Sequence, residues 1–448
     1  MTLPAFLSPG GASGWPLTLA NDLTLGHTDA VAGLQHKNPI IAAEYGIVPD
    51  GGDHGAALNT LIAQVSTAGG GSIILPAGNI YTSVPIDLRS FVHLHGVSWY
   101  GSQLRLWPGS TCDVIQFHQS TNGTTDSNAF YCGIWNLAIH GEGFNGSRTA
   151  YADYSHGINC TTNPVNTAAS ADIEFDPTHI ICNVYMKACT GNGYYHLGRS
   201  GVRLIGVYSG WNNGNGFYPS YDTEMIGCHA GFNGLNGFYS WHSSNRYTGC
   251  KSYNNGNNTI WTSGQNWALC AGALYNNDGN YYVAKAALTS DTVAPPSDAT
   301  NWDVVDSGYP DGGQAGFVVD YTGDAETAFS SCDAQQNAGS GFYLHNCSGV
   351  TVQGTVHQIN TVNGGGTNAS TNTFHKAAVV LDGAKGNNIN VVTGDLGPAG
   401  NVLRSINSST RNNVTLGSDL TEAAELTTDS TAIAGSGNWV LFNGTATS

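Results

Sequence analysis

The sequence has 448 residues, of which 60 are glycine and only 10% are charged, and its formal net charge is −17. The chain has only 14 Lys and Arg in all. This small number argues against a nucleic-acid-binding protein, which needs basic residues along the phosphate backbone. Its aromatic content of 10% and low charge density also exclude a disordered chain and favour a long all-β solenoid.

Residues 1–40 are rich in Gly, Pro and polar residues and predict an irregular N-terminal arm. The first 22 residues lack a basic segment and a long apolar run. We therefore expect neither a secretory signal nor a membrane-inserted segment there.

Residues 40–98 contain one helical pattern followed by short strands. Asp53 is placed to cap a helix, and the apolar residues behind it recur with the 3.6-residue period of an α-helix. Gly69-Gly70-Gly71 ends this pattern, and Ser72–Leu75 and Ile80–Thr82 read as strands on either side of a Pro-Ala-Gly turn.

This order of elements resembles the N-terminal signature of the pectate-lyase-like parallel β-helix proteins. The matching positions are Tyr45-Gly46, Asp50-Gly51, Asp53, Ala57, Gly69-Gly70-Gly71, Pro76, Gly78 and Tyr81. The departures are Ile47-Val48-Pro49 and His54. The resemblance implies an all-β, right-handed parallel β-helix over residues 41–420 with an N-terminal capping helix. It carries less functional information, because lyases, hydrolases, epimerases and phage tailspikes share this fold.

A repeat of about 22 residues supports the solenoid. Rows starting at Val184, Val207, Cys228 and Cys250 align, and a fifth row starts at Cys332. A period this short fits one coil of stacked strands rather than a pair of helices.

Three columns of this repeat have a physical meaning. Small apolar residues in the first column predict inward packing, which makes Cys228, Cys250 and Cys332 buried free thiols. An Asn column predicts an inward ladder whose amides bond from coil to coil. Each row ends in a pair of neighbouring aromatic or large apolar residues, and the second residue of each pair is predicted to point outward. Together these residues form an aromatic stripe that serves either sugar binding or packing: Tyr195, Tyr218, Tyr239, Trp261 and Tyr343.

Residues 268–312 interrupt the repeat and predict an inserted, aromatic-rich β module. The segment around Tyr281, Tyr282, Lys285 and Trp302 loosely resembles small carbohydrate-binding modules, although an ordinary coil insertion remains an alternative. Coils resume at Gly316, and residues 421–448 predict a C-terminal cap or tail. No Cys pattern typical of zinc is present, so we expect no metal site and no cofactor.

Candidate catalytic residues follow the aromatic column, where a β-helix presents an outer groove. Glycoside hydrolysis needs two carboxyl groups roughly 5–9.5 Å apart, and carboxylates on neighbouring coils meet that spacing. We assign Glu224 as proton donor and Asp222 or Asp320 as base or nucleophile, with Asp324 and His242 as further candidates. Sugar binding is assigned to Tyr218, Tyr239, Trp241, Trp261 and Arg246.

Two alternatives stay open. β-Elimination on a uronate would use His242, Tyr221 or Tyr239 as base, with Arg199, Arg203 or Arg246 neutralising the carboxylate. The other interpretation is a non-catalytic carbohydrate-binding fibre. Separately, the acidic cluster of Asp172, Glu174 and Asp176 is a secondary candidate for the wall of a cleft. The first interpretation is a polysaccharide-degrading glycoside hydrolase. The tailspike-like resemblance implies a homotrimer that is extracellular or virion-associated, and no nucleic-acid partner is expected.

Overall fold

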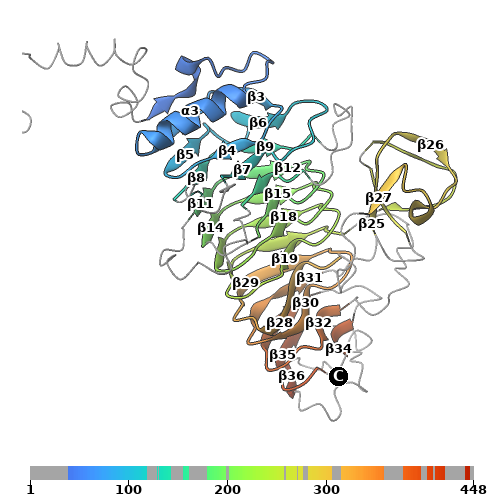
Figure 1. The fold of residues 1–448 in the computed structure, drawn as a ribbon. Helices are drawn as coiled ribbons and strands as arrows, with labels where there is room; N and C mark the ends of the chain where they lie inside the picture. The colour runs from blue at the N-terminus through green and yellow to red at the C-terminus, as the bar shows by residue number, and fades with distance from the viewer. Residues whose placement is uncertain are drawn as a thin grey trace, which may run out of the picture.

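The computed structural model describes residues 39–118, 129, 131–142, 155–160, 179–197, 201–256, 259–269, 271–275, 281–304, 314–357, 377–394, 401–406, 409–418 and 439–443. These residues form a parallel β-helix, as predicted, in which successive coils stack along one axis (Figure 1). The predicted N-terminal arm, except for Pro39 and Ile40, lies outside the described residues. Among the described residues, no helix has the length and apolarity needed to cross a membrane.

One side of the solenoid is a ten-stranded parallel sheet, here called the first side. Its strands are β4 (Ile86–Leu88), β7 (Ile115–Phe117), β10 (Ile158–Asn159), β13 (Tyr194–Tyr195), β16 (Phe217–Tyr218), β19 (Phe238–Ser240), β28 (Phe317–Asp324), β30 (Phe342–Ser348), β32 (Ala377–Asp382) and β34 (Asn401–Ile406).

The other two sides belong to one 20-stranded sheet. The second side stacks β2 (Gly71–Ile74), β5 (Val92–His95), β8 (Gly133–Trp135), β11 (His179–Cys182), β14 (Val202–Ile205), β17 (Thr223–Ile226) and β20 (Arg246–Thr248). The third side stacks β3 (Gly78–Thr82), β6 (Ser102–Leu106), β9 (Ala138–His140), β12 (Tyr185–Lys187), β15 (Tyr208–Gly210), β18 (His229–Gly231) and β21 (Lys251–Tyr253).

The second and third sides merge after β21, because β29 (Ala328–Gln335) pairs with both β20 and β21. The merged coils continue through β31 (Thr351–His357), β33 (Asn388–Thr393) and β35 (Asn413–Ser418). β36 (Trp439–Asn443) pairs in parallel with β35, so this part of the predicted tail adds one more rung to the stack.

The N-terminal end carries helix α3 (Gly55–Thr67) after the 3-10 helix η2 (Ala42–Tyr45), and β1 (Ile40–Ile41) pairs with β2. The apolar positions predicted from the helical period, Leu58, Leu61, Ile62 and Val65, are buried. Asp53 accepts a hydrogen bond from the Gly55 amide, whereas His54 occupies the N-cap position. The helix lies across the first coils and covers strands that would otherwise present an open end (Figure 1).

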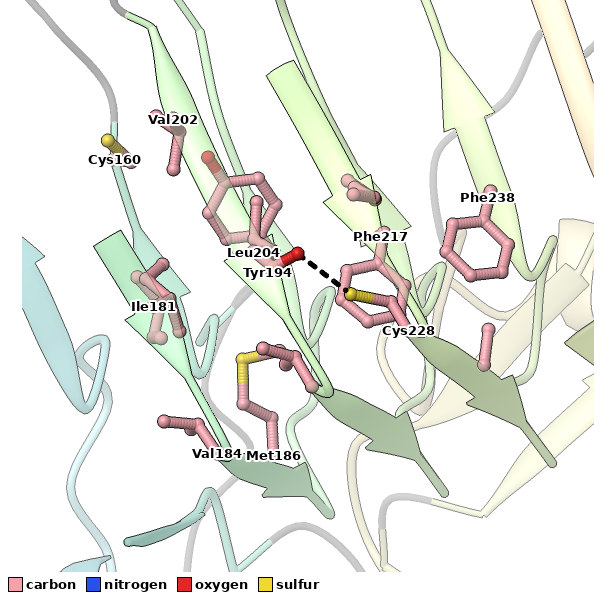
Figure 2. Close-up of a cluster of buried hydrophobic side chains, with 14 of the residues drawn as sticks. Cys160, Ile181, Val184, Met186, Tyr194, Val202, Leu204, Phe217, Cys228 and Phe238 are labelled. Carbon is pink, nitrogen blue, oxygen red and sulfur yellow. Dashed lines mark hydrogen bonds between the residues drawn. The ribbon is translucent and has the colours of Figure 1, made fainter. Parts of the chain in front are cut away.

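Apolar side chains fill the interior of the stack (Figure 2). Phe217, Phe238, Phe317 and Phe342 form an inward ladder with ring centroids 4.8–5.1 Å apart. The predicted column of buried free thiols is confirmed: Cys228, Cys250 and Cys332 are buried and unbridged. Their Sγ atoms donate to backbone carbonyls, as Cys228 does to Leu204 in Figure 2.

The predicted Asn ladder is also confirmed. Side-chain amides bond consecutively from Asn212 to Asn233, from Asn233 to Asn255 and from Asn255 to Asn337, at 2.8–2.9 Å. Each carbonyl oxygen also accepts a backbone amide of the preceding coil, so the ladder satisfies turn groups that are buried. A second ladder joins Asn192, Asn215 and Asn236.

The inserted segment forms small sheets of its own. β22 (Thr259–Ile260), β24 (Gly272–Leu274), β25 (Tyr281–Ala284) and β27 (Trp302–Val304) make one, and β23 (Gln265–Trp267) pairs with β26 (Leu288–Asp291). Asp291, at the end of β26, is buried and accepts hydrogen bonds from the indoles of both Trp261 and Trp302. The placement of β22 here is a correction, because Ile260 and Trp261 do not continue the coil repeat.

Candidate active site

The outer face of the first side carries two columns of side chains, because alternate residues of a strand point outward. The first column runs through Tyr195, Tyr218, Tyr239, Val318 and Tyr343. The second column stands two residues further along each strand and contains Trp241, Asp320, His345 and Asp382. Polar groups able to do acid–base chemistry therefore lie beside an aromatic column.

Asp320 is a carboxylate of the second column that is held from two directions. Its Oδ2 accepts a hydrogen bond from the hydroxyl of Tyr239, and its Oδ1 lies 2.6 Å from Nδ1 of His345. Partial burial opposes ionisation, but the hydrogen bonds from His345 and Tyr239 outweigh it and hold the pKa of Asp320 below its usual 3.8. Asp320 is therefore an oriented, ionised carboxylate at neutral pH.

His345 is held by this carboxylate in one orientation. Because an ionised carboxylate only accepts, Nδ1 of a neutral His345 carries the proton and donates to Asp320. Nε2 is then an acceptor, and the side-chain amide of Asn346 lies 2.8 Å from it. In this tautomer the basic nitrogen of the imidazole, Nε2, is directed to the side-chain amide of Asn346.

A second tyrosine–aspartate pair repeats the arrangement further along the stack. The hydroxyl of Tyr343 donates to Oδ2 of Asp382, just as Tyr239 donates to Asp320. Asp382 lies next to His345 in the register of β32 and β30, and it is buried. His345 thus stands between two aspartates, one on each neighbouring coil.

Aromatic rings bound the site on the N-terminal side. Trp241 stacks against Tyr218 with ring centroids 6.2 Å apart, and its indole donates to the carbonyl of His196. The ring of His242 lies between those of Tyr221 and Tyr321, and its Nδ1 accepts the Ser243 amide. Trp241 and Tyr218 are partly exposed and can contact a bound ligand.

The aromatic stripe departs from its predicted form in two ways. Tyr239 and Tyr343 point outward as predicted, but they are only 4% and 0% exposed because they pack with Val318 and Val380. They hold aspartates rather than present ring faces. Trp261 is not in the column at all: it packs in the inserted module, and Val318 takes the position between Tyr239 and Tyr343.

The structure does not bring Glu224 to Asp320. Glu224 lies on β17 of the second side, where its carboxylate is 2.5 Å from Nε of Arg203 and it pairs in register with Arg246. Arg246 donates to the carbonyl of Glu326. Glu224 and Arg246 therefore face outward on a different side of the solenoid from the tyrosine–aspartate pairs.

Two other predicted acids lie at the edge of the first side. Asp222 is exposed in the turn before β17, with a φ of 51°, and Asp324 is exposed at the end of β28. Neither has a place in the two outward columns. Asp172, Glu174, Asp176 and Arg199 lie outside the described residues.

Sequence reasoning assigned no role to His345 and Asp382. The sequence feature that could have identified them is a two-residue spacing within the rows. It separates Tyr239 from Trp241, Tyr343 from His345, and Val380 from Asp382. Two-residue spacing puts both members of each pair on one face of a strand. Within the described part of the chain, no group of three or more His, Cys, Asp or Glu residues is arranged to hold a metal ion.

No family model matches the sequence, and no curated protein matches it. Solved structures do. The A-module of mannuronan C-5 epimerase AlgE6 from Azotobacter vinelandii superposes with a TM-score of 0.54 at 14% identity, covering 90% of this chain and 99% of that one. Full-length tailspike protein 2 from an Escherichia coli O157:H7 bacteriophage gives 0.54 at 14% identity, covering 86% and 43%. ORF18 of Geobacillus virus E2 gives 0.51 at 15% identity, covering 91% and 64%. These similarities confirm the parallel β-helix resemblance; at such identities they establish the fold alone.

Proposed function

We propose that the protein is a polysaccharide-processing enzyme whose reaction takes place on the outer face of the first side, around Asp320 and His345. The observation that carries this proposal is the Tyr239–Asp320–His345 cluster, since a carboxylate oriented from two directions beside a fixed imidazole is suited to acid–base work. Tyr218 and Trp241 border the cluster and can pack against the apolar C–H faces of sugar rings. The fold is shared with a mannuronan epimerase module and a phage tailspike, which agrees with a polysaccharide substrate.

Within this class we propose glycoside hydrolysis by Asp320 and Asp382. The two residues are separated by one coil, and coils stack about 4.8 Å apart, which puts their Cα atoms roughly 9.6 Å apart. This Cα spacing is close to the upper end of the range of about 6.5–9.5 Å that separates the carboxyl groups of inverting glycosidases and leaves room for a water molecule. Asp320, which stays ionised, is the candidate base toward water, and Asp382 is the candidate proton donor. This replaces Glu224 as donor, because Glu224 bonds Arg203 on another side.

β-Elimination is the second candidate, and the tautomer of His345 favours it. A lyase needs a base beside a uronate carbon and a cation near the uronate carboxylate. Nε2 of His345 would be this base once substrate displaces the Asn346 amide from it, and Arg404 follows Val380 in the first column. Both reactions use the same cluster, so the products decide between them.

A polysaccharide screen tests the proposal. The protein is incubated with bacterial surface and extracellular polysaccharides, and reducing ends and absorbance at 235 nm are recorded. New ends without absorbance indicate hydrolysis, and new ends with absorbance indicate elimination. Binding without new ends would contradict a chain-cleaving enzyme and favour a carbohydrate-binding fibre. An Asp303→Asn variant in the inserted module serves as a matched control for amide substitutions in the cluster.

We also propose that the protein assembles as a homotrimer and is extracellular or virion-associated. Support comes from the tailspike among the similar structures and from the long sides of the solenoid.

A further inference from the structure

The third side carries an aromatic surface that the proposed reaction does not use. It is formed by outward residues of β12, β15 and β21, by the turns after β15 and β18, and by Tyr100 in the turn before β6. The strands β12, β15, β18 and β21 stack in consecutive coils (Figure 1). We call it the third-side patch, and its members are Tyr100, Tyr208, Trp211, Phe232, Tyr253, Lys187 and Lys251, while the buried ring of Tyr185 packs against Tyr100 and Tyr208.

Glycines let two tyrosine rings of this patch lie along the sheet. A Cβ at Gly210 would be 2.6 Å from Cε1 of Tyr208, and a Cβ at Gly231 would be 2.6 Å from Cζ of Tyr253. The rings therefore occupy the space above these glycines, and their hydroxyls bond each other at 2.9 Å. A ring that covers a glycine turns one face to the strand and the other away from it.

Trp211 and Phe232 extend the patch at the ends of β15 and β18. Their rings are stacked 5.0 Å apart at 10°, and they are 43% and 40% exposed. Both residues have a left-handed backbone, with φ of 54° and 58°. Ala188, Asn254 and Gln336 hold the same left-handed turn in other coils, so the turn itself does not require an aromatic residue.

Cations stand over the tyrosine rings. Nζ of Lys187 lies 5.6 Å from the ring centroid of Tyr185, and Nζ of Lys251 lies 5.8 Å from that of Tyr253. Lysine and tyrosine side chains supply hydrogen-bond donors at the edges of the aromatic faces. This combination of ring faces, hydroxyls and ammonium groups suits sugar rings, whose C–H faces are apolar and whose rims carry hydroxyls.

We propose that the third-side patch is a non-catalytic polysaccharide-binding site. It lies on a different sheet from Asp320 and His345, so it binds a stretch of glycan without contacting the reacting groups. The aromatic rings recur at the coil spacing along the solenoid, which matches an extended chain better than a single monosaccharide.

Affinity electrophoresis tests the site with three defined probes: polygalacturonate as an acidic polymer, and dextran and hydroxyethylcellulose as neutral ones. We expect at least one to retard the protein. The double variant Trp211→Asn and Phe232→Asn should bind that polymer about tenfold more weakly, because two stacking rings are lost. Asparagine is chosen because Asn254 occupies the equivalent turn. Retardation by none of the three polymers would overturn the proposal.

Phe91 and Tyr131 provide a matched control. They are also exposed, stacked and left-handed, with centroids 5.8 Å apart, but they lie beside strands of the second side. The variant Phe91→Asn and Tyr131→Asn should bind as the wild type does. Equal loss in the Phe91 and Tyr131 variant would show unspecific aromatic adhesion and overturn the assignment.

Gly231→Ala gives a second test that keeps every aromatic ring. The three atoms nearest the new Cβ all belong to the Tyr253 side chain, so the substitution should displace that ring and weaken binding severalfold. Light scattering on each variant separates glycan binding from self-association. If the Trp211 and Phe232 variant changes the molar mass while polymer binding is retained, the patch is an interface between copies of this chain, and the proposal fails.

Discussion

The hydroxyl of Tyr239 donates a hydrogen bond to the carboxylate of Asp320, although 81 positions separate the two residues in the chain. They meet because β19 pairs directly with β28, and the inserted segment leaves and re-enters the solenoid between these two coils. The candidate site is therefore assembled across the point where the sequence repeat is interrupted.

Replacing Asp320 with Asn should abolish the proposed reaction. The amide keeps the shape of the side chain but cannot act as a base, and we expect a loss of about a hundredfold or more in rate on the polymer found by the screen. Thermal unfolding should change little, and Asp303→Asn should retain full activity. Near-wild-type activity of Asp320→Asn would place the reaction elsewhere, with Asp222 and Asp324 at the edge of the first side next to be tested.

Replacing Tyr239 with Phe should alter the pH dependence rather than remove the activity. The hydroxyl of Tyr239 stabilises ionised Asp320, so its loss raises the pKa of that carboxyl. The acidic limb of the kcat/KM profile that reports Asp320 should move to higher pH, while the rate near neutral pH falls less than in Asp320→Asn. A lower rate with an unmoved acidic limb would indicate a purely packing role for Tyr239.

Asn233→Ala should destabilise the solenoid by about 1–3 kcal/mol, because it leaves buried hydrogen-bonding groups of Asn212, Ser209 and Asn255 without their partner. Urea unfolding monitored by tryptophan fluorescence measures this. Asn388→Ala, at an exposed position, is the control and should unfold as the wild type does. An unchanged midpoint for Asn233→Ala would contradict a structural role for the ladder.

Stability should fall between pH 6.5 and pH 5, before most carboxylates titrate. Burial lowers the pKa of His156, His179 and His196 from 6.5 to about 3. In this interval the three histidines become protonated in the unfolded chain but stay neutral in the folded chain. The free energy of unfolding therefore decreases as the pH falls. The expected slope is roughly 1.4 kcal/mol per pH unit for each of these histidines once the pH is well below 6.5. Urea midpoints at several pH values test this, and a flat profile down to pH 5 would contradict it.

The proposed trimer predicts a molar mass near three times the 46.8 kDa of one chain. Light scattering coupled to size exclusion measures it directly. A monomer mass across a range of protein concentrations would refute the assembly without affecting the proposed reaction, because Tyr239, Asp320 and His345 all belong to one chain.

The sequence by itself determined the features that depend on local period. The apolar spacing of Leu58, Leu61, Ile62 and Val65 specified a buried helix face, and the rows of about 22 residues specified the coils. The Asn column specified a ladder, because a residue that returns at the same point of every coil must stack on itself. Each of these signals recurs with the period of one helical turn or of one coil.

Only the tertiary structure decided which side chains meet. The row ending in Ile260 and Trp261 looks like a further coil, but these residues belong to the inserted module, and Val318 continues the column after Tyr239. Likewise, Glu224 follows the aromatic column closely in sequence, yet a turn at Asp222 carries it onto the second side, where it bonds Arg203. The physical reason is that a solenoid sets its contacts by coil stacking and by the side on which each strand lies. An insertion or a turn changes both without changing the local pattern that the sequence displays.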